Sequence, residues 1–237
     1  MLYYRLMKRF PLAILIILLL CCYANAQSEL DRSTVRDGVY TNFAFGFTFK
    51  YPKDWVVHGE ATNERIRQIG KERIVESGAL PKATAEVAVS NTYQLLTVFH
   101  YPVGTPGITF NPGILVIAEK VDFAPGITNG KDYLLNLRAI LRKTGTQVLL
   151  KEPMEYHFGG SQFFRDDYAV NVNGVTVVEA FFSTVTNGYA LGFIFMGENQ
   201  KSVDEMAKAM ETLEQMPPIR KGVTISGPPT QPSAPKP

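Results

Sequence analysis

The chain has little cysteine and no excess of charge of either sign. Its 237 residues include two cysteines, Cys21 and Cys22, and its 24 basic residues nearly balance its 22 acidic ones. A sequence without cysteine after position 22 has no catalytic thiol, disulfide framework or cysteine-ligated metal in the rest of the chain. Near-neutral charge also argues against a nucleic-acid binder, because such proteins carry a basic surface.

A long hydrophobic run is also missing. The apolar stretch from Phe10 to Cys22 is shorter than the roughly 20 residues that a membrane-spanning helix requires. It follows a basic segment, Met1–Arg9, and precedes Ala24-Asn25-Ala26, the small-residue pattern of a signal-peptidase site. We expect cleavage after Ala26, with Gln27 as the first mature residue, export to the periplasm or medium, and no membrane span afterwards. An uncleaved anchor and a lipid-modified cysteine are the alternatives.

Composition divides the chain into four segments. Residues 1–26 form the signal peptide, and the polar, unpatterned residues 27–37 are interpreted as a mobile leader. Residues 38–216 have no internal linker and are predicted to form a single domain. Residues 217–237 include seven prolines and cannot bury a core, so they are predicted to be a disordered tail.

Aromatic residues occupy every odd position from Phe43 to Tyr51, which predicts a strand with an aromatic face that Pro52 ends. Other patterns predict strands over 95–101 and 114–123. Residues 83–90 fit either a helix or a strand. Helices are predicted over 63–76 with Asn63 as N-cap, from Asn129 to Gly145, and from a capping box at 202–205 to Pro217.

Three turn dipeptides, Gly159-Gly160, Asn173-Gly174 and Asn187-Gly188, predict a meander of four antiparallel strands. Its strands are expected over 147–158, 161–172, 175–186 and 189–197. Two-residue turns fix the register, which places Met154, Arg165, Phe182 and Phe193 in one row across the strands. The next row is Tyr156, Phe163, Thr184 and Leu191. Apolar residues then lie on both faces, so both need cover. The expected fold is α+β, a three-layer α/β/α sandwich around a mainly antiparallel sheet.

The segment Phe47-Thr-Phe49-Lys-Tyr51-Pro52-Lys-Asp-Trp55 resembles the F-x-F-x-Y-P-x-x-W opening of the PsbP-like family. That family includes extrinsic proteins of the photosynthetic oxygen-evolving complex, a Ran-binding nuclear-import factor and exported bacterial proteins. The resemblance extends over about residues 38–216 through the order of elements. It implies a non-catalytic module that binds a partner, and it transfers no functional residue to this chain.

The predicted register brings together one cluster of ionisable side chains. Tyr168 is expected to face Glu179 on one side and Lys151 on the other, with Asp166 nearby. A hydrolase or isomerase would use Glu179 as a general base with Asp166 and Tyr168 beside it. The alternative, which we favour because no catalytic motif accompanies the cluster, is a set of buried polar groups that satisfy one another.

Three further candidates are weaker. Glu155 and His157 lie two residues apart on one strand face and offer two ligands for a divalent cation. Phe110 lies in a glycine- and proline-rich loop, 102–113, and is a candidate contact residue. The sequence therefore favours an exported binding or accessory module with no catalytic residue and no cofactor. Its expected partner is a small ligand or another envelope or secreted protein.

Overall fold

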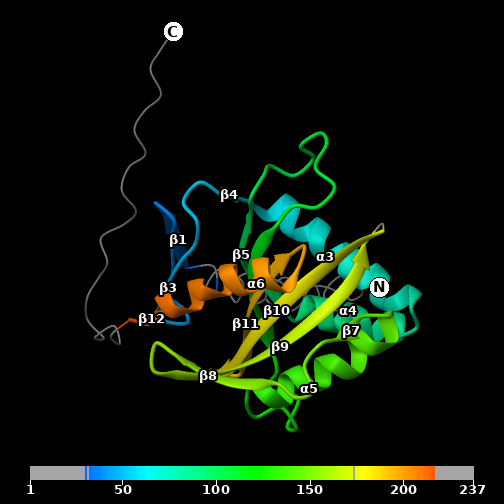
Figure 1. Ribbon diagram of the computed structural model, residues 1–237. Helices are drawn as coiled ribbons and strands as arrows, with labels where there is room; N and C mark the ends of the chain where they lie inside the picture. Colours follow the sequence, from blue (N-terminus) through cyan, green and yellow to red (C-terminus); the bar gives the residue numbers. More distant parts are fainter. Residues whose placement is uncertain (1–29, 31, 173, 217–237) are drawn as a thin grey trace, which may run out of the picture.

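The computed structural model describes residues 30, 32–172 and 174–216, which fold as an α+β protein with two antiparallel sheets (Figure 1). The predicted signal peptide and proline-rich tail lie outside these residues. The small sheet has the order β1 (Ser33–Arg36), β2 (Val39–Asn42), β3 (Phe47–Lys50) and β12 (Glu214–Gln215). The large sheet has the order β4 (Val56–Val57), β5 (Thr92–Phe99), β6 (Gly113–Lys120), β11 (Tyr189–Gly197), β10 (Val175–Thr186), β9 (Ser161–Val172) and β7 (Gln147–Val148), and β8 (Met154–Phe158) also pairs with β9.

Helices cover one face of the large sheet. They are α3 (Glu60–Glu76), α4 (Lys82–Ser90) and α5 (Gly130–Leu141). The Thr97 hydroxyl on β5 donates to Asn63 Oδ1 on α3 at 2.7 Å. The Tyr133 ring of α5 packs edge-on against Phe181 of β10, 6.0 Å away between centroids.

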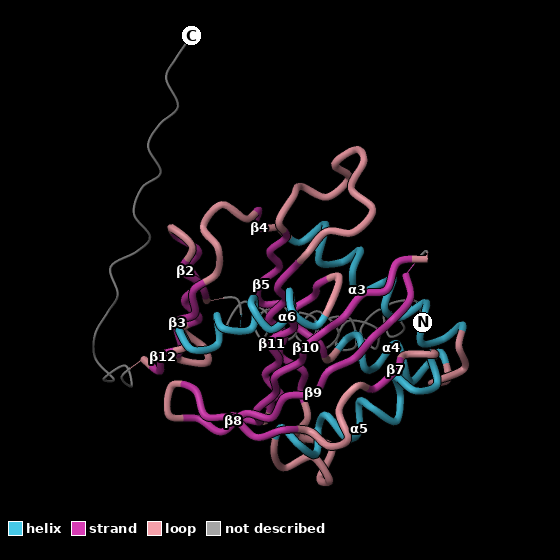
Figure 2. The backbone as a smooth tube through the Cα atoms, viewed as in Figure 1, coloured by secondary structure: helices cyan, strands magenta, loops and turns pink. Residues whose placement is uncertain are grey.

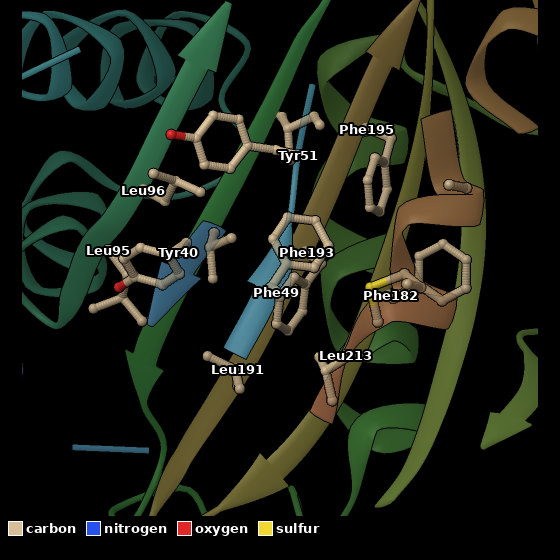
Figure 3. Close-up of a cluster of buried hydrophobic side chains, with 14 of the residues drawn as sticks. Tyr40, Phe49, Tyr51, Leu95, Leu96, Phe182, Leu191, Phe193, Phe195 and Leu213 are labelled. Atoms are coloured by element: carbon tan, nitrogen blue, oxygen red, sulfur yellow. The ribbon is translucent and has the colours of Figure 1, made fainter. Parts of the chain in front are cut away.

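The opposite face is covered by α6 (Gln200–Ala207), the 3₁₀ segment η2 (Lys208–Thr212) and the small sheet. Both faces are therefore covered, as the apolar pattern predicts. The outer layer on this side contains strands as well as α6, because β3 lies against β11. Figure 3 shows Phe49 of β3 beside Phe193 of β11, with 5.3 Å between ring centroids.

The aromatic strand is shorter than predicted. Phe47 and Phe49 are fully buried on β3, and Tyr51 is buried just beyond it. Residues 43–46 instead form a turn in which Gly46 has φ +68°, a conformation that favours glycine. Phe45 leaves the strand face and packs edge-on against Tyr189. Chain reversal at Gly46 lets β2 pair with β3, which a single long strand would prevent.

The meander is confirmed for three of its four strands. Met154 faces Arg165, Arg165 faces Phe182, and Phe182 faces Phe193, as predicted. Gly159-Gly160 and Asn187-Gly188 all have positive φ, as two-residue hairpin turns require. The predicted strand 147–158 is wrong, because it divides into β7 and β8 around Pro153. Proline has no N–H for the ladder, so pairing stops there.

Several segment boundaries also differ from prediction. Residues 33–36, assigned to a mobile leader, form β1 and pair with β2. The ambiguous residues 83–90 belong to helix α4. Gly59, and not Asn63, precedes α3. Asn63 lies inside the helix, where its side chain accepts from the Thr97 hydroxyl.

The C-terminal capping box also lies earlier than predicted. It is formed by Asn199 and Ser202 at the start of α6. The following helical segments end at Thr212, well before Pro217, because the chain extends to pair as β12 with β3.

Candidate functional site

The β9–β10 ladder opens at one end. Pairing along these strands stops at Phe164 and Ser183, one pair short of the predicted Phe163–Thr184 neighbours. Beyond this point Phe163 and the residues before it pair only with β8, whereas β10 continues against β11. The separation leaves a pocket of about 410 Å³ between the two strands. This volume lies within the range of small-molecule sites.

Five separate segments converge on this pocket. They are the turn before β3, the start of α5, the β8–β9 hairpin, the end of β10 with the facing part of β11, and the chain around β12. The lining residues are Phe45, Phe47, Thr128, Asn129, Gly130, Ser161, Gln162, Phe163, Thr184, Val185, Thr186, Leu191, Leu213 and Gln215. We call this site the split-ladder pocket.

Local interactions at the start of α5 define one wall of the pocket. The Asn129 side chain caps the helix by accepting from the Asp132 N–H at 3.0 Å, as predicted. The Thr128 hydroxyl donates to the Asp132 carboxylate at 2.6 Å. Gly130 packs so closely on β10 that a Cβ there would lie 2.0 Å from the Ser183 carbonyl oxygen. Only glycine lets α5 begin this near the sheet.

The split-ladder pocket has polar but uncharged walls. None of its described lining residues is an acid, a base, a histidine or a tyrosine. The polar groups are the hydroxyls of Thr128, Ser161, Thr184 and Thr186 and the carboxamides of Asn129, Gln162 and Gln215. Hydrogen bonding is therefore available without acid–base chemistry, which requires a titratable group within reach of the substrate.

The ionisable cluster predicted from the register forms in part. Tyr168 faces Glu179 across β9 and β10, and its hydroxyl donates to Asp166 Oδ2 at 2.7 Å. Lys151 does not join them, because β7 is shifted along β9 and places Val148 opposite Tyr168. The Lys151 side chain is exposed beyond the strand end, and the prediction for this residue is wrong.

A buried arginine completes the cluster. Arg138 of α5 donates through Nε to Asp166 Oδ2 and through Nη2 to Oδ1 at 2.7 Å. It also donates to the backbone carbonyls of Leu150 and Lys151 at 3.2 and 3.0 Å. We call the side chains of Arg138, Asp166 and Tyr168 the α5 network. Asp166 and Tyr168 are 0% exposed and Arg138 is 4% exposed, so no substrate in solvent reaches them.

The surroundings shift the pKa values of Arg138 and Tyr168 in this network and of the neighbouring Glu179. Hydrogen bonding to Asp166 raises the pKa of the Arg138 guanidinium. Burial, followed by the charge of Asp166, raises the pKa of Tyr168, so its hydroxyl stays protonated and donates. Burial also raises the pKa of Glu179, although the charge of Arg73 on α3 opposes that change.

Arg138 is not among the candidate residues that the sequence predicted. One signal was present: it lies four residues after Leu134 and three before Leu141, both on the apolar side of the helix. A charged residue at such a position is rare unless it is paired, and Asp166 is its partner.

Glu155 and His157 are not among the residues that line the split-ladder pocket. Glu155 and His157 lie on β8 with 3.6 Å between Oε1 and Nε2, and both side chains are largely exposed. Within the described residues no group of three or more His, Cys, Asp or Glu side chains converges as a metal site would. The Glu155 carboxylate instead accepts from Gln162 Nε2 at 2.7 Å.

The loop that contains Phe110 projects from the body between β5 and β6 (Figure 2). Asn111 closes its base by accepting from the Tyr101 N–H at 2.9 Å and donating to the Tyr101 carbonyl at 2.7 Å. Phe110 is half-buried, and the exposed apolar side chains of the loop are Tyr101, Val103 and Ile108. The loop therefore has an ordered base.

Within the described residues no helix has the length and apolar character needed to cross a bilayer. No protein-family model and no curated protein matches the sequence.

Several solved structures resemble the chain in fold. Cyanobacterial PsbP from Synechocystis sp. PCC 6803 is 12% identical with a TM-score of 0.44, over 77% of this chain and 95% of that one. LpqN, involved in cell envelope biogenesis of Mycobacterium tuberculosis, is 11% identical with a TM-score of 0.37, over 72% and 83%. A Pseudomonas aeruginosa protein of unknown function is 14% identical with a TM-score of 0.37, over 54% and 83%. Likenesses this distant assign neither a family nor a function, so function is inferred from the pocket.

Proposed function

We propose that the chain is an exported, non-catalytic binding or accessory module and that the split-ladder pocket is its binding site. One observation carries the proposal: the pocket has hydrogen-bonding walls without a titratable side chain among its described lining residues. Such a site holds a ligand or a partner's side chain but offers no general acid or base. The ligand or partner occupies the 410 Å³ between β9, β10 and the start of α5.

The position of the ionisable groups supports this proposal over a hydrolase or isomerase. Asp166 and Tyr168 are fully buried and occupied by Arg138 and by each other. Glu179 lies beside them on the face that the helices cover, away from the split-ladder pocket. Their geometry is that of a buried polar network whose members satisfy one another.

Export is the second part of the proposal and rests on the sequence. The basic segment, short apolar run and Ala24-Asn25-Ala26 of the first 26 residues have the order of a cleaved signal. We propose a periplasmic or extracellular location, with an envelope or secreted protein or a small ligand as partner. N-terminal sequencing of the tagged protein from its native host should then begin at Gln27.

The binding role is tested by filling the pocket. Thr184 lines it near the end of β10, whereas Thr176 is exposed at the other end of the same strand. Tagged Thr184→Trp should lose a ligand or partner that the wild-type chain and Thr176→Trp both retain during purification from the native envelope fraction. Equal retention by both variants would refute the assignment of the pocket.

A separate measurement tests the enzyme alternative. If Glu179 were a general base, Glu179→Gln would abolish a turnover activity and leave the melting temperature unchanged. We expect instead a change in the pH dependence of stability and no activity to lose.

A further inference from the structure

We propose that the split-ladder pocket recognises a neutral saccharide of one or two sugar units. This inference rests on the proposed binding function and specifies its ligand. Three features of the pocket carry it: the lack of charge in its walls, the kind of polar groups that it presents, and the way in which its segments converge.

Charge is the first feature. A charged ligand that enters the pocket gives up its hydration, and no oppositely charged side chain among the described lining residues replaces it. Removing an ion from water without a counter-charge is far more costly than removing a neutral hydroxyl that finds a hydrogen bond. The pocket therefore favours an uncharged ligand over its carboxylate or ammonium analogue.

The polar groups are the second feature. Hydroxyls, as in Thr184 and Thr186, both donate and accept, and so does a carboxamide such as that of Gln215. No hydrogen bond within the described residues occupies the hydroxyl of either threonine, whereas the Gln215 amide donates to Ser161 Oγ at 3.0 Å. A purely apolar ligand would leave the two threonine hydroxyls unpaired, at a cost for each one. A ligand with several hydroxyls pairs them.

Apolar surface lies between these polar groups. Phe45 is half-buried, and Phe163 and Leu191 form the deeper wall. A sugar ring has hydroxyls around its edge and C–H groups on its faces, so it matches a wall in which both kinds of surface alternate. The volume of about 410 Å³ lies toward the lower end of ligand pockets, which suits one or two rings.

The arrangement of segments favours a saccharide over a peptide. A peptide that adds as a strand needs a row of free backbone groups along a sheet edge. β10 extends only from Thr184 to Thr186 beyond its ladder with β9, and its other side stays paired with β11. The rest of the pocket consists of side chains from four other segments. A compact ligand with hydroxyls in several directions fits this convergence better than an extended chain.

The test is titration of the ¹⁵N-labelled mature chain, residues 27–237, with maltose, cellobiose and N,N′-diacetylchitobiose at millimolar concentration, followed by NMR. At least one disaccharide should shift the amide signals of Gly130, Thr184 and Thr186 in a saturable way. Thr184→Val and Thr186→Val should each weaken that binding about 3- to 10-fold, because each removes one hydrogen bond. Thr176→Val makes the same change outside the pocket and should leave the affinity unaltered.

Charged and peptide probes provide the contrary outcomes. Chitobiose without its acetyl groups, which carries ammonium groups, should bind at least tenfold more weakly than the diacetyl form. Saturable binding of both forms with equal affinity, or no binding by any of the three neutral disaccharides, overturns the saccharide proposal. Binding of N-acetyl-Ser-Gly-Ser-amide at these same residues, without any disaccharide, also overturns it but leaves the binding function intact. That function fails separately, if Thr184→Trp retains every ligand and partner of the wild-type chain.

Discussion

Three consecutive residues of β9 enter two networks on opposite sides of the large sheet. Asp166 faces the helix α5, whereas Arg165 and Asp167 face α6, because successive side chains of a strand alternate between its faces. The α5 network is closed: Asp166 is fully buried, and Arg138 is 5% exposed in its side chain. On the α6 side, Arg165 bonds both Asp167 and Asp204, and the Asp204 side chain is 49% exposed.

This difference in exposure decides what each network contributes. A charge left alone in a dry interior costs several kcal/mol, whereas a charge near water is resolvated. The two networks use the same chemistry, a carboxylate–guanidinium pair that joins a helix to β9. Loss of one charged partner should therefore lower stability strongly beneath α5 and only slightly at Asp204 on the α6 side.

Removal of Arg138 should have the largest effect. Arg138→Met leaves the buried Asp166 carboxylate without its counter-charge and two backbone carbonyls without their donor, so we expect a loss of about 3–5 kcal/mol in the free energy of unfolding. Urea denaturation measures it. The triple variant Arg138→Met, Asp166→Leu, Tyr168→Phe removes every member of the α5 network and should be more stable than Arg138→Met alone. A triple variant less stable than Arg138→Met would show that the unpaired Asp166 carboxylate is not the main cost of that substitution.

The α6 side depends more on apolar packing than on its charges. Phe47 and Phe49 of β3 pack on Phe193, and each is at most 1% exposed. We expect Phe47→Ala and Phe49→Ala to cost about 3–5 kcal/mol each through lost burial and a cavity. Phe43→Ala, in the turn before β3, is the control and should cost less. Wild-type melting temperatures for Phe47→Ala and Phe49→Ala, combined with loss of a partner, would instead identify this surface as an interface.

Tyr168→Phe gives a smaller change within the α5 network. It removes a hydrogen bond to a charged acceptor and keeps the ring, so the expected loss is about 1.5–3 kcal/mol. In a double-mutant cycle with Asp166→Asn, followed by thermal denaturation, the two changes together should cost less stability than the sum of their separate costs. Additive effects of the two changes would mean that the hydroxyl and the carboxylate act independently.

The two networks also differ in how far local sequence predicts them. The alternation of Arg165, Asp166 and Asp167 between faces follows from strand geometry, and the two-residue turns set the register from Arg165 to Phe193. These features depend on residues near one another in the chain. Arg138 lies 28 residues before Asp166, so its pairing follows from the way in which α5 lies across β9.

The split-ladder pocket shows the same limit of prediction from local sequence. The register rule predicted Phe163 opposite Thr184 and so closed the gap in which the pocket lies. The ladder ends where α5 begins directly on Ser183 through Gly130 and where β12 brings Leu213 and Gln215 into the lining. Contacts between distant segments compete with the local pairing rule here. Pro153, by contrast, was a local signal for the break between β7 and β8.

Asp204→Asn should have a small effect on stability. It weakens the bond between Arg165 and α6 at a half-exposed carboxylate, and Arg165 keeps Asp167 as partner. We expect a loss of at most about 1 kcal/mol, which salt should reduce further. Urea denaturation at low and high salt measures both quantities. A loss as large as that of Arg138→Met would contradict the distinction drawn from exposure.

Replacement of Glu179 has the smallest expected effect. It should change the slope of the free energy of unfolding against pH. Burial raises its folded-state pKa above the ordinary value of 4.5, so the folded chain keeps this proton at pH values where the unfolded chain has lost it. The stabilisation from this group is complete below the unfolded-state pKa and is lost as pH rises through the folded-state pKa.

Glutamine cannot ionise, so Glu179→Gln should gain stability relative to the wild-type chain as pH rises through that window, and the two curves should then run parallel. Denaturation curves from acid to neutral pH measure the difference. Glu205→Gln is the control: its exposed carboxylate pairs with Lys208, which lowers its pKa, so its effect should have the opposite sign. A Glu179→Gln difference that is constant with pH would show that the pKa of this carboxyl is the same in the folded and unfolded chains.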